Sequence, residues 1–260
     1  MSNEIDTRLK LAVTIAEEAG RITLEYFAQP DLKVERKKDD SPVTVADRRA
    51  EEHLRRRIAE AFPDDGILGE EFDDVPGRNP WRWILDPIDG TKSFIHGVPL
   101  YSTLVAVQYE EKSVLGVIRI PAMAECVYAA DDRGAWYVRG DAAPAPARVS
   151  TTPTLAESLF VTSEVITFDE VDRRAAYERL EKAARLTRTW GDAYGYLMVA
   201  TGRADVMVDP VVEEWDVAAM LPILREAGGV FTDWNGVETT HSRQGVATNR
   251  LLLDEVLMLL

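Results

Sequence analysis

Four β-rich segments follow one another between residues 101 and 138, and this run constrains the fold more than any other feature of the sequence. The segments lie at 101–109, 113–120, 125–130 and 135–138, and short polar, turn-like pieces separate them. Short strands spaced in this way are typical of an antiparallel meander. The middle of the chain is therefore predicted to form a β-sheet whose neighbouring strands are also neighbours in sequence.

The region before this run is predicted to be mainly helical. Apolar residues recur at helical spacing over residues 4–28, which indicates a long amphipathic helix. A second helix is expected over 46–61, with Thr44 as its N-cap and Asp47 three residues on. The remaining expectations are a charged loop over 31–42, a turn over 63–66 and a short buried strand over 83–85.

Strands alternate with helices in the second half of the sequence. We expect strands at 158–162, 186–189, 206–208, 230–232 and 246–248, and helices near 169–184, 192–201, 215–227 and 251–259. Such alternation indicates an α/β arrangement, so the whole chain is predicted to be a layered mixture of α+β and α/β structure. The stretch near 140–150 is the one plausible seam. It divides an N-terminal half, 1–145, from a C-terminal half, 146–260, within one compact catalytic unit.

Acidic residues outnumber basic ones, with 45 Asp and Glu against 30 Lys and Arg in 260 residues, for a net charge of −15. This balance argues against a nucleic-acid or anionic-membrane partner, because phosphate backbones attract a basic surface. It is compatible with a small phosphorylated metabolite as substrate, since a bound cation reverses the local sign of charge.

The sequence also predicts a cytoplasmic protein. Its single cysteine, Cys126, cannot form an internal disulfide, which fits a reducing compartment. The first ten residues lack the apolar core of a signal peptide, and no apolar run approaches the roughly 20 residues that span a bilayer. We therefore expect no membrane partner.

Three acidic motifs are the candidates for chemistry: Gly69-Glu70-Glu71, Asp86-Pro87-Ile88-Asp89-Gly90-Thr91 and Trp215-Asp216. In the second, a proline and an Asp-Gly turn follow an apolar strand, so both carboxylates and the intervening carbonyl can face one point. Oxygen ligands of this kind suit a hard cation such as Mg²⁺. Taken singly, each motif has a plainer explanation, namely a surface turn, a solvated loop or an acidic residue at a helix start.

The motifs occur in a fixed order along nearly the whole chain. Lys37-x-Asp39-x-Ser41-Pro42-Val43-Thr44-x-Ala46-Asp47 precedes the three acidic motifs, and Gly228-Gly229 follows them. This combination resembles the inositol monophosphatase superfamily. The resemblance implies a Mg²⁺-dependent, lithium-sensitive phosphomonoesterase, with the layered αβαβα sandwich fold of the inositol monophosphatase and fructose-1,6-bisphosphatase type, assembled as a homodimer.

Matched position by position, the resemblance implies roles for single residues. Roughly two or three Mg²⁺ ions would be held by Glu70, Asp86, Asp89, Asp216 and the Ile88 carbonyl. The catalytic residues would be Asp47 and Thr91, which orient and deprotonate the attacking water, together with Glu70. The backbone amides of Gly90 and Thr91 would bind the phosphate, Asp216 would also lie against the substrate, and Lys37 and Asp39 would lie on a mobile loop that closes the site.

This chemistry requires no covalent nucleophile, because metal ions neutralise the phosphoryl oxygens and lower the pKa of the attacking water. The sequence offers no evident one. Cys126 lies in a β-rich stretch and is expected to be a small buried hydrophobic residue. His53, His96 and His241 lack the spacing of a zinc site.

The substrate is expected to be chosen by the second half of the chain. Inositol phosphatases of the family typically carry Gly-Ser-Ala where this sequence has Gly191-Asp192-Ala193, and Arg188-x-x-Gly191-Asp192-x-Tyr194 resembles the bacterial histidinol-phosphatase branch. That branch implies hydrolysis of L-histidinol phosphate to L-histidinol in histidine biosynthesis. Asp192 and Asp209 would pair with the amine and the imidazole, away from the metals, and Arg188 would reach the phosphate or fix Asp192.

Several alternatives stay open at this stage. Asp192 would serve equally as a plain N-cap of the helix that follows it. An inositol-1-phosphate phosphatase or a 3′(2′),5′-bisphosphate nucleotidase would use the same chemistry, although no adenine pocket is recognisable. A non-catalytic binding member of the fold would have lost a ligand, Thr91 or Asp47, and none of these is lost.

Overall fold

A computed structural model describes residues 2–37 and 41–260, and its larger β-sheet is built around the predicted meander. The strand order is β3-β4-β5-β6-β7-β8-β9, with β3 parallel to β4 and all other neighbours antiparallel. The strands are β3 (Gly66–Gly69), β4 (Trp81–Asp89), β5 (Ser102–Tyr109), β6 (Lys112–Ile120), β7 (Glu125–Ala130), β8 (Ala135–Arg139) and β9 (Ala145–Pro146). The meander prediction is confirmed in β5 to β8.

The smaller sheet comes entirely from the second half of the chain, in the order β11-β10-β12-β14-β13. Its strands are β10 (Leu159–Val161), β11 (Leu186–Arg188), β12 (Val206–Asp209), β13 (Gly229–Thr232) and β14 (Gly245–Asn249). β10 is parallel to both β11 and β12, whereas β14 is antiparallel to its neighbours. The helices between the parallel strands explain the alternation seen in the sequence.

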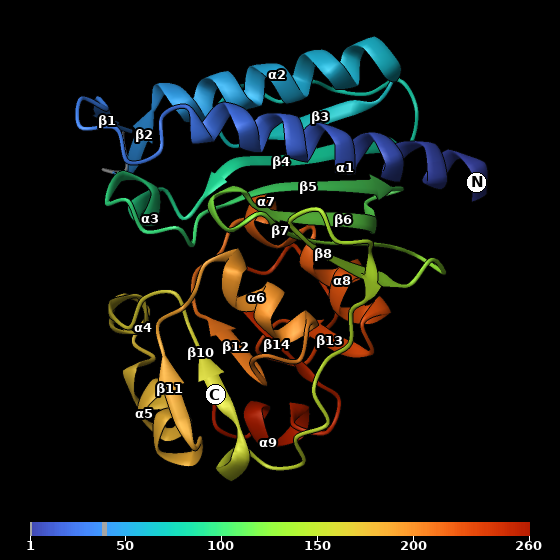
Figure 1. Ribbon diagram of the computed structural model, residues 1–260. Coiled ribbons are helices and arrows are strands. Elements are labelled where there is room, and N and C mark those ends of the chain that lie inside the picture. The colour runs from blue at the N-terminus through green and yellow to red at the C-terminus, as the bar shows by residue number, and fades with distance from the viewer. Residues whose placement is uncertain (1, 38–40) are drawn as a thin grey trace.

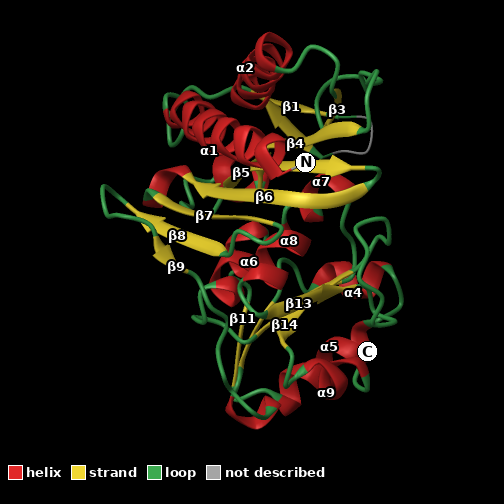
Figure 2. Ribbon diagram, turned by 90° about the vertical axis from the view of Figure 1, so that its right-hand side faces the viewer, coloured by secondary structure: helices red, strands yellow, loops and turns green. Residues whose placement is uncertain are grey.

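Helices form three layers around the two sheets (Figures 1 and 2). The outer layer on the large sheet is α1 (Ser2–Leu24) and α2 (Val45–Ala61). Between the sheets lie α6 (Ala193–Ala200), α7 (Glu214–Val217) and α8 (Met220–Glu226). The far layer, on the small sheet, is α4 (Ile166–Glu170), α5 (Arg174–Ala183) and α9 (Leu253–Leu257). The result is the expected αβαβα sandwich, and no helix in the described ranges is long and apolar enough to cross a membrane.

Each helix layer buries one apolar face. On α1, residues Ala12, Ile15, Ala16 and Ala19 are fully buried, and they share one core with Leu54 of α2 and with Trp83 and Leu85 of β4. The core between the sheets draws on both, and it includes Ile84 of β4, Leu197 of α6, Ile223 of α8 and Phe231 of β13. Burial of these side chains supplies the main force that holds the layers together.

Several element bounds differ from the sequence prediction. Residues 31–42 were expected to be a loop, but β1 (Val34–Arg36) and β2 (Pro42–Thr44) pair antiparallel within it. All three β1 residues are exposed, so no alternation of apolar and polar residues marked the strand. The predicted helix 4–28 ends at Leu24 instead, and Phe27 packs on Phe94 and Tyr101 rather than extending the helix.

Two expected helices are each divided in two. The helix predicted over 169–184 is α4 followed by α5, and Asp172, between them, has a positive φ of 55° that interrupts the helix. The helix predicted over 215–227 is α7 followed by α8, with Pro222 in the first turn of α8, where its missing N–H is tolerated. The turn at 63–66 leads directly into β3, which the sequence analysis missed.

A buried ion pair ties α1 to the edge of the large sheet. The guanidinium of Arg8 donates two hydrogen bonds of 2.8 Å to Asp65, whose carboxylate also accepts from Asn79 and from the Trp83 indole. The same guanidinium stacks on Trp81, 4.1 Å from the ring centroid. Because every partner is satisfied, the pair is tolerated in the core.

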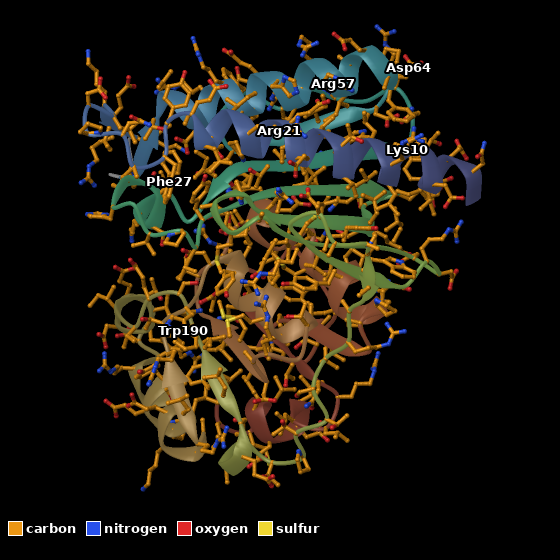
Figure 3. All side chains as sticks on the ribbon, in the orientation of Figure 1. Lys10, Arg21, Phe27, Arg57, Asp64 and Trp190 are labelled. Carbon is orange, nitrogen blue, oxygen red and sulfur yellow. The ribbon has the colours of Figure 1, made fainter. Side chains whose placement is uncertain are left out.

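Replacing Arg8 with leucine should lower the free energy of unfolding by about 3 kcal/mol, because the buried Asp65 charge loses its counter-ion. The matched control is Arg78→Leu, which removes the partner of Asp64 from a pair exposed by 85 % and 58 % at the surface (Asp64 is labelled in Figure 3). Urea denaturation should show little change for the control. Equal losses in the two variants would contradict a special role for the buried pair.

Candidate active site

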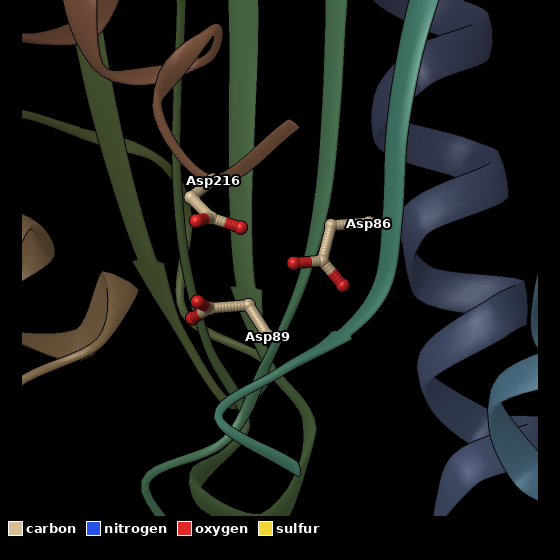
Figure 4. A group of neighbouring side chains, drawn as sticks. All are labelled: Asp86, Asp89 and Asp216. Atoms are coloured by element: carbon tan, nitrogen blue, oxygen red, sulfur yellow. The ribbon is translucent and has the colours of Figure 1, made fainter. Parts of the chain in front are cut away.

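Three carboxylates converge where β4 ends, between the two sheets. Pro87 follows Asp86, and the ladder between β4 and β5 is irregular between Asp86 and Asp89. The backbone N–H of Ile88 donates to Asp86 Oδ1 at 3.0 Å, which stabilises the bend. Figure 4 shows the side chains of Asp86 and Asp89 turned toward Asp216, which comes from α7. One oxygen of each carboxylate lies within 4.8 Å of the others.

Hydrogen bonds fix two of these carboxylates from outside the cluster. Asp89 Oδ2 accepts from the Ser102 hydroxyl at 2.7 Å and from the backbone N–H of Ala193, the first residue of α6, at 2.8 Å. Asp216 Oδ2 accepts from the Glu213 N–H at 2.8 Å within a capping box of α7. The large sheet, α6 and α7 therefore position the cluster.

Burial and mutual repulsion disfavour the charged form of all three groups. Burial is the largest cause that raises the pKa of Asp86 and Asp89 well above the usual value, and neighbouring carboxylates add to it. Burial likewise raises the pKa of Asp216 to about 7, even though the Glu213 N–H opposes the shift. Three carboxylates this close together require bound protons or a bound cation to relieve their repulsion. Their oxygen atoms fit a hard divalent ion. The residues present therefore fit Mg²⁺.

Lys37 neutralises the outer part of this acidic region. Its ammonium lies 2.7 Å from Glu70 Oε1 and 2.6 Å from Glu71 Oε1. Burial by itself lowers the pKa of Lys37, but the attraction of Glu70 and Glu71 outweighs it and raises the pKa. Glu70 lines the same cavity as Asp86, although it is not one of the three convergent residues. Asp39, predicted to share a loop with Lys37, lies outside the described residues.

Asp47 is buried next to the start of α2, where the predicted capping box is present. Its Oδ2 accepts from the Thr44 N–H at 2.8 Å and from the Thr44 hydroxyl at 2.6 Å. Its buried Oδ1 has no hydrogen-bond partner among the described residues. Burial is the main cause that raises the pKa of Asp47 to about 6, so this group can exchange a proton near neutral pH.

Gly90 and Thr91 form the turn that follows the cluster. Gly90 has φ +80°, which favours glycine, and α3 (Thr91–Ile95) begins immediately after it. The Thr91 hydroxyl donates to the Ile88 carbonyl oxygen at 3.1 Å. A Cβ on Gly90 would lie only 2.7 Å from Asp192 Oδ2, so this turn and Asp192 are in close contact.

A cavity of about 320 Å³ joins the acidic cluster to the substrate residues predicted from the sequence. Its lining includes Glu70, Asp86, Ile88, Asp89, Gly90, Thr91, Asp192, Asp209 and Asp216. The cavity is also lined by four residues that were not predicted as site residues, Lys92, Ser163, Glu164 and Tyr196. Ser163 and Glu164 follow the carboxyl end of β10, and ligands of parallel sheets generally bind at that end. This rule was the signal that would have identified them.

Asp192 lies closer to the acidic cluster than the sequence suggested. It was expected to lie away from the metals, yet its charge is one of the causes that raise the pKa of Asp89. It occupies the N-cap position of α6 without any side-chain capping hydrogen bond, and its backbone is unusual, with φ 50° and ψ −159°. The N-cap alternative therefore does not explain this residue. Burial raises its own pKa to about 6.

Arg188 does not line the cavity, although the next residue, Thr189, does. Its side chain is exposed, donates to the Thr187 carbonyl oxygen, and lies 5.8 Å from the ring of Trp190, which Figure 3 labels near the outer edge of the small sheet. Asp47 is also absent from the cavity lining. The other predicted site residues that the structure describes either line the cavity or, like Lys37, pair with a residue that does.

Comparisons with known proteins agree with this geometry. The model of the inositol monophosphatase family matches residues 4–258. A histidinol-phosphatase of Chlorobaculum parvum is 44% identical over 240 residues, covering 92% of this chain and 91% of the relative. A histidinol-phosphatase of Streptomyces coelicolor is 38% identical and covers 96% of this chain and 95% of the relative.

Solved structures resemble the whole fold. The inositol monophosphatase of Thermotoga maritima is 32% identical, with a TM-score of 0.86 and coverage of 97% of this chain and 96% of that one. The SuhB protein of Bartonella henselae is 27% identical, with a TM-score of 0.89 over 97% of this chain and 98% of that one. With its carboxylate cluster and its layered fold, the chain belongs to the inositol monophosphatase family and is a phosphomonoester hydrolase.

Proposed function

We propose that this protein is a Mg²⁺-dependent phosphatase that hydrolyses L-histidinol phosphate to L-histidinol and phosphate. The observation that carries the proposal is a single cavity lined both by the convergent carboxylates and by the further acidic residues Asp192, Asp209 and Glu164. The convergent carboxylates suit a cation that holds a phosphate, and the further acidic residues suit a leaving group that carries an amine and an imidazole. The histidinol-phosphatases among its relatives support the same substrate.

In this proposal, Glu70, Asp86, Asp89, Asp216 and the Ile88 carbonyl hold the metal. Bound Mg²⁺ supplies charge neutralisation of the phosphate and a more acidic water. The backbone amides of Gly90 and Thr91 bind the phosphate oxygens, and glycine permits the close approach there because its φ is positive. Asp86 Oδ1 already accepts from Ile88, so the bend is formed before substrate binds.

Water is the nucleophile in this proposal. The Thr91 hydroxyl orients it, and Asp47 accepts its proton, for which a pKa of about 6 is well suited. The water oxygen forms a bond to phosphorus as the bond from phosphorus to the ester oxygen breaks. The ester oxygen leaves with the electron pair, takes up a proton and departs as the hydroxyl of L-histidinol.

Other expectations from the resemblance remain predictions. They are inhibition by lithium, assembly as a homodimer, a cytoplasmic location and a place in histidine biosynthesis. The assignment of metal and nucleophile residues to 1–145 and of specificity residues to 146–260 is likewise a proposal. Arg188 was expected to reach the phosphate or to fix Asp192. Either role requires the exposed segment that carries Arg188 to move toward the cavity that holds the carboxylates.

Metal binding should stabilise the protein in a pH-dependent way. Carboxylates whose pKa is raised by folding bind more protons in the native state, so the metal-free protein should lose stability as pH rises from about 4 through 7. Mg²⁺ offsets this repulsion and should therefore raise Tm more at pH 8 than at pH 5.5. Asp86→Asn should abolish both the Mg²⁺ shift and nearly all turnover. An equal shift at the two pH values, or full activity in EDTA, would contradict the proposed site.

The backbone conformation of Asp192 should lower the stability of the protein, whereas its side chain should contribute to activity. A side chain in its backbone conformation costs about 1–3 kcal/mol, whereas glycine loses roughly 0.5–1 kcal/mol in entropy. Asp192→Gly should therefore raise the Tm of the metal-free protein by about 2–4 °C and lower kcat/KM for L-histidinol phosphate. Asp192→Asn keeps the Cβ and removes only the charge. Equal Tm values for the two variants in thermal denaturation would contradict a cost from the backbone conformation of Asp192.

The substrate is tested by phosphate release from L-histidinol phosphate, myo-inositol 1-phosphate and 3′-phosphoadenosine 5′-phosphate, each with Mg²⁺. We expect the highest kcat/KM for L-histidinol phosphate. Thr91→Ala should lower kcat about 100-fold or more on every substrate, which assigns the activity to this cavity. A preference for one of the other two esters would replace the proposed substrate with an alternative named above. A phosphoenzyme trapped by rapid quench would contradict direct attack by water.

A further inference from the structure

Beyond the convergent carboxylates, the cavity is lined by three further acidic side chains, Asp192, Asp209 and Glu164. L-histidinol phosphate has two nitrogen groups to meet them. Its ammonium is on the carbon next to the phosphate ester carbon, and its imidazole lies further along the chain. The hydrogen bonds that each carboxylate already accepts determine which of them can accept one from each nitrogen group.

Asp209 already has a full set of hydrogen bonds. Its Oδ1 accepts from the Thr162 hydroxyl at 3.2 Å and the Ser163 N–H at 3.0 Å. Its Oδ2 accepts from the Ser163 hydroxyl at 3.0 Å and from Tyr196 at 3.2 Å. A carboxylate offers about four lone-pair positions, so a substrate N–H would have to displace a buried donor. Asp209 is thus a positioning residue that holds Ser163 and Tyr196.

Asp192 lies at the phosphate end of the cavity. Its Oδ2 is in contact with Gly90, and its backbone N–H donates to the Ser163 hydroxyl at 2.8 Å. The ammonium of the substrate, one carbon from the ester carbon, is the group that falls within reach of this position. The imidazole extends beyond it.

Glu164 is the remaining carboxylate, and it lies at the mouth. Its carbonyl oxygen accepts from the Thr167 hydroxyl at 2.7 Å, which fixes the backbone there. Its Oε2 accepts from Lys92 at 2.7 Å, in a pair whose side chains are exposed by 65 % for Lys92 and 37 % for Glu164. No donor to Oε1 is present among the described residues. An ion pair this exposed contributes little, so a substrate N–H can readily share the carboxylate.

We infer that Glu164 is a specificity-determining residue whose carboxylate accepts a hydrogen bond from the imidazole of the substrate, while Asp192 meets the ammonium. This inference rests on the proposed function and assigns the second nitrogen group to Glu164 instead of Asp209. Both the neutral and the protonated imidazole carry an N–H that can donate to it.

The test compares kcat/KM for L-histidinol phosphate with kcat/KM for 4-nitrophenyl phosphate, an ester whose leaving group carries no cation. Glu164→Gln should lower the ratio of the two values about tenfold, which corresponds to about 1.4 kcal/mol. Glu170→Gln makes the same chemical change on the exposed end of α4 and should leave the ratio unchanged. Lys92→Met removes the ion pair but keeps Glu164, and it should not lower the ratio.

Two results would overturn the inference. One is a ratio that stays within twofold of wild type in Glu164→Gln. The other is an equal fall in Lys92→Met, which would mean that Glu164 acts only by holding Lys92. Failure of the proposed function would give a different result. In that case the wild-type protein itself would show no higher kcat/KM for L-histidinol phosphate than for 4-nitrophenyl phosphate.

Discussion

Repulsion among carboxylates that are held together away from bulk water is the constraint on which the rest of the site depends. Asp86, Asp89 and Asp216 bring three acidic groups within 4.8 Å of one another, with Asp86 buried and the other two half-buried. Folding holds them together although burial and mutual repulsion raise the pKa of each and so disfavour its charged form. A protein tolerates such a cluster where a bound cation compensates it, and this need connects the fold to phosphate-ester chemistry.

The layered fold explains how the repulsion is contained. The carboxylates come from two kinds of position: the irregular end of a strand for Asp86 and Asp89, and the first turn of an inner helix for Asp216. Ser102 of the large sheet and the N–H of Ala193 at the start of α6 both donate to Asp89 Oδ2. The large core between the sheets therefore fixes the site as well as the fold. Outside it, Lys37 balances Glu70 and Glu71.

The sequence predicted the features that depend on local chemistry. The meander was recognisable from its spacing, the Thr44 capping box from its two residues, and the acidic motifs from their order. What it could not show depends on tertiary contacts. The exposed strand β1 carries no apolar pattern, and the breaks at Asp172 and near Pro222 lie within continuous helical periodicity. The full set of hydrogen bonds to Asp209 and the position of Glu164 at the mouth of the cavity depend on how β10, β12 and α6 pack together. The sequence of one segment alone does not indicate such contacts.

The central claim is that the carboxylates of β4 and α7 form a divalent cation site. The most direct measurement is anomalous diffraction from crystals soaked in Mn²⁺, an oxygen-seeking ion that substitutes for Mg²⁺ and is visible at its absorption edge. The account predicts an anomalous peak about 2–2.3 Å from oxygens of Asp86, Asp89 and Asp216, and its loss in Asp86→Asn. A wild-type crystal with no peak among these three residues at saturating Mn²⁺ would contradict it.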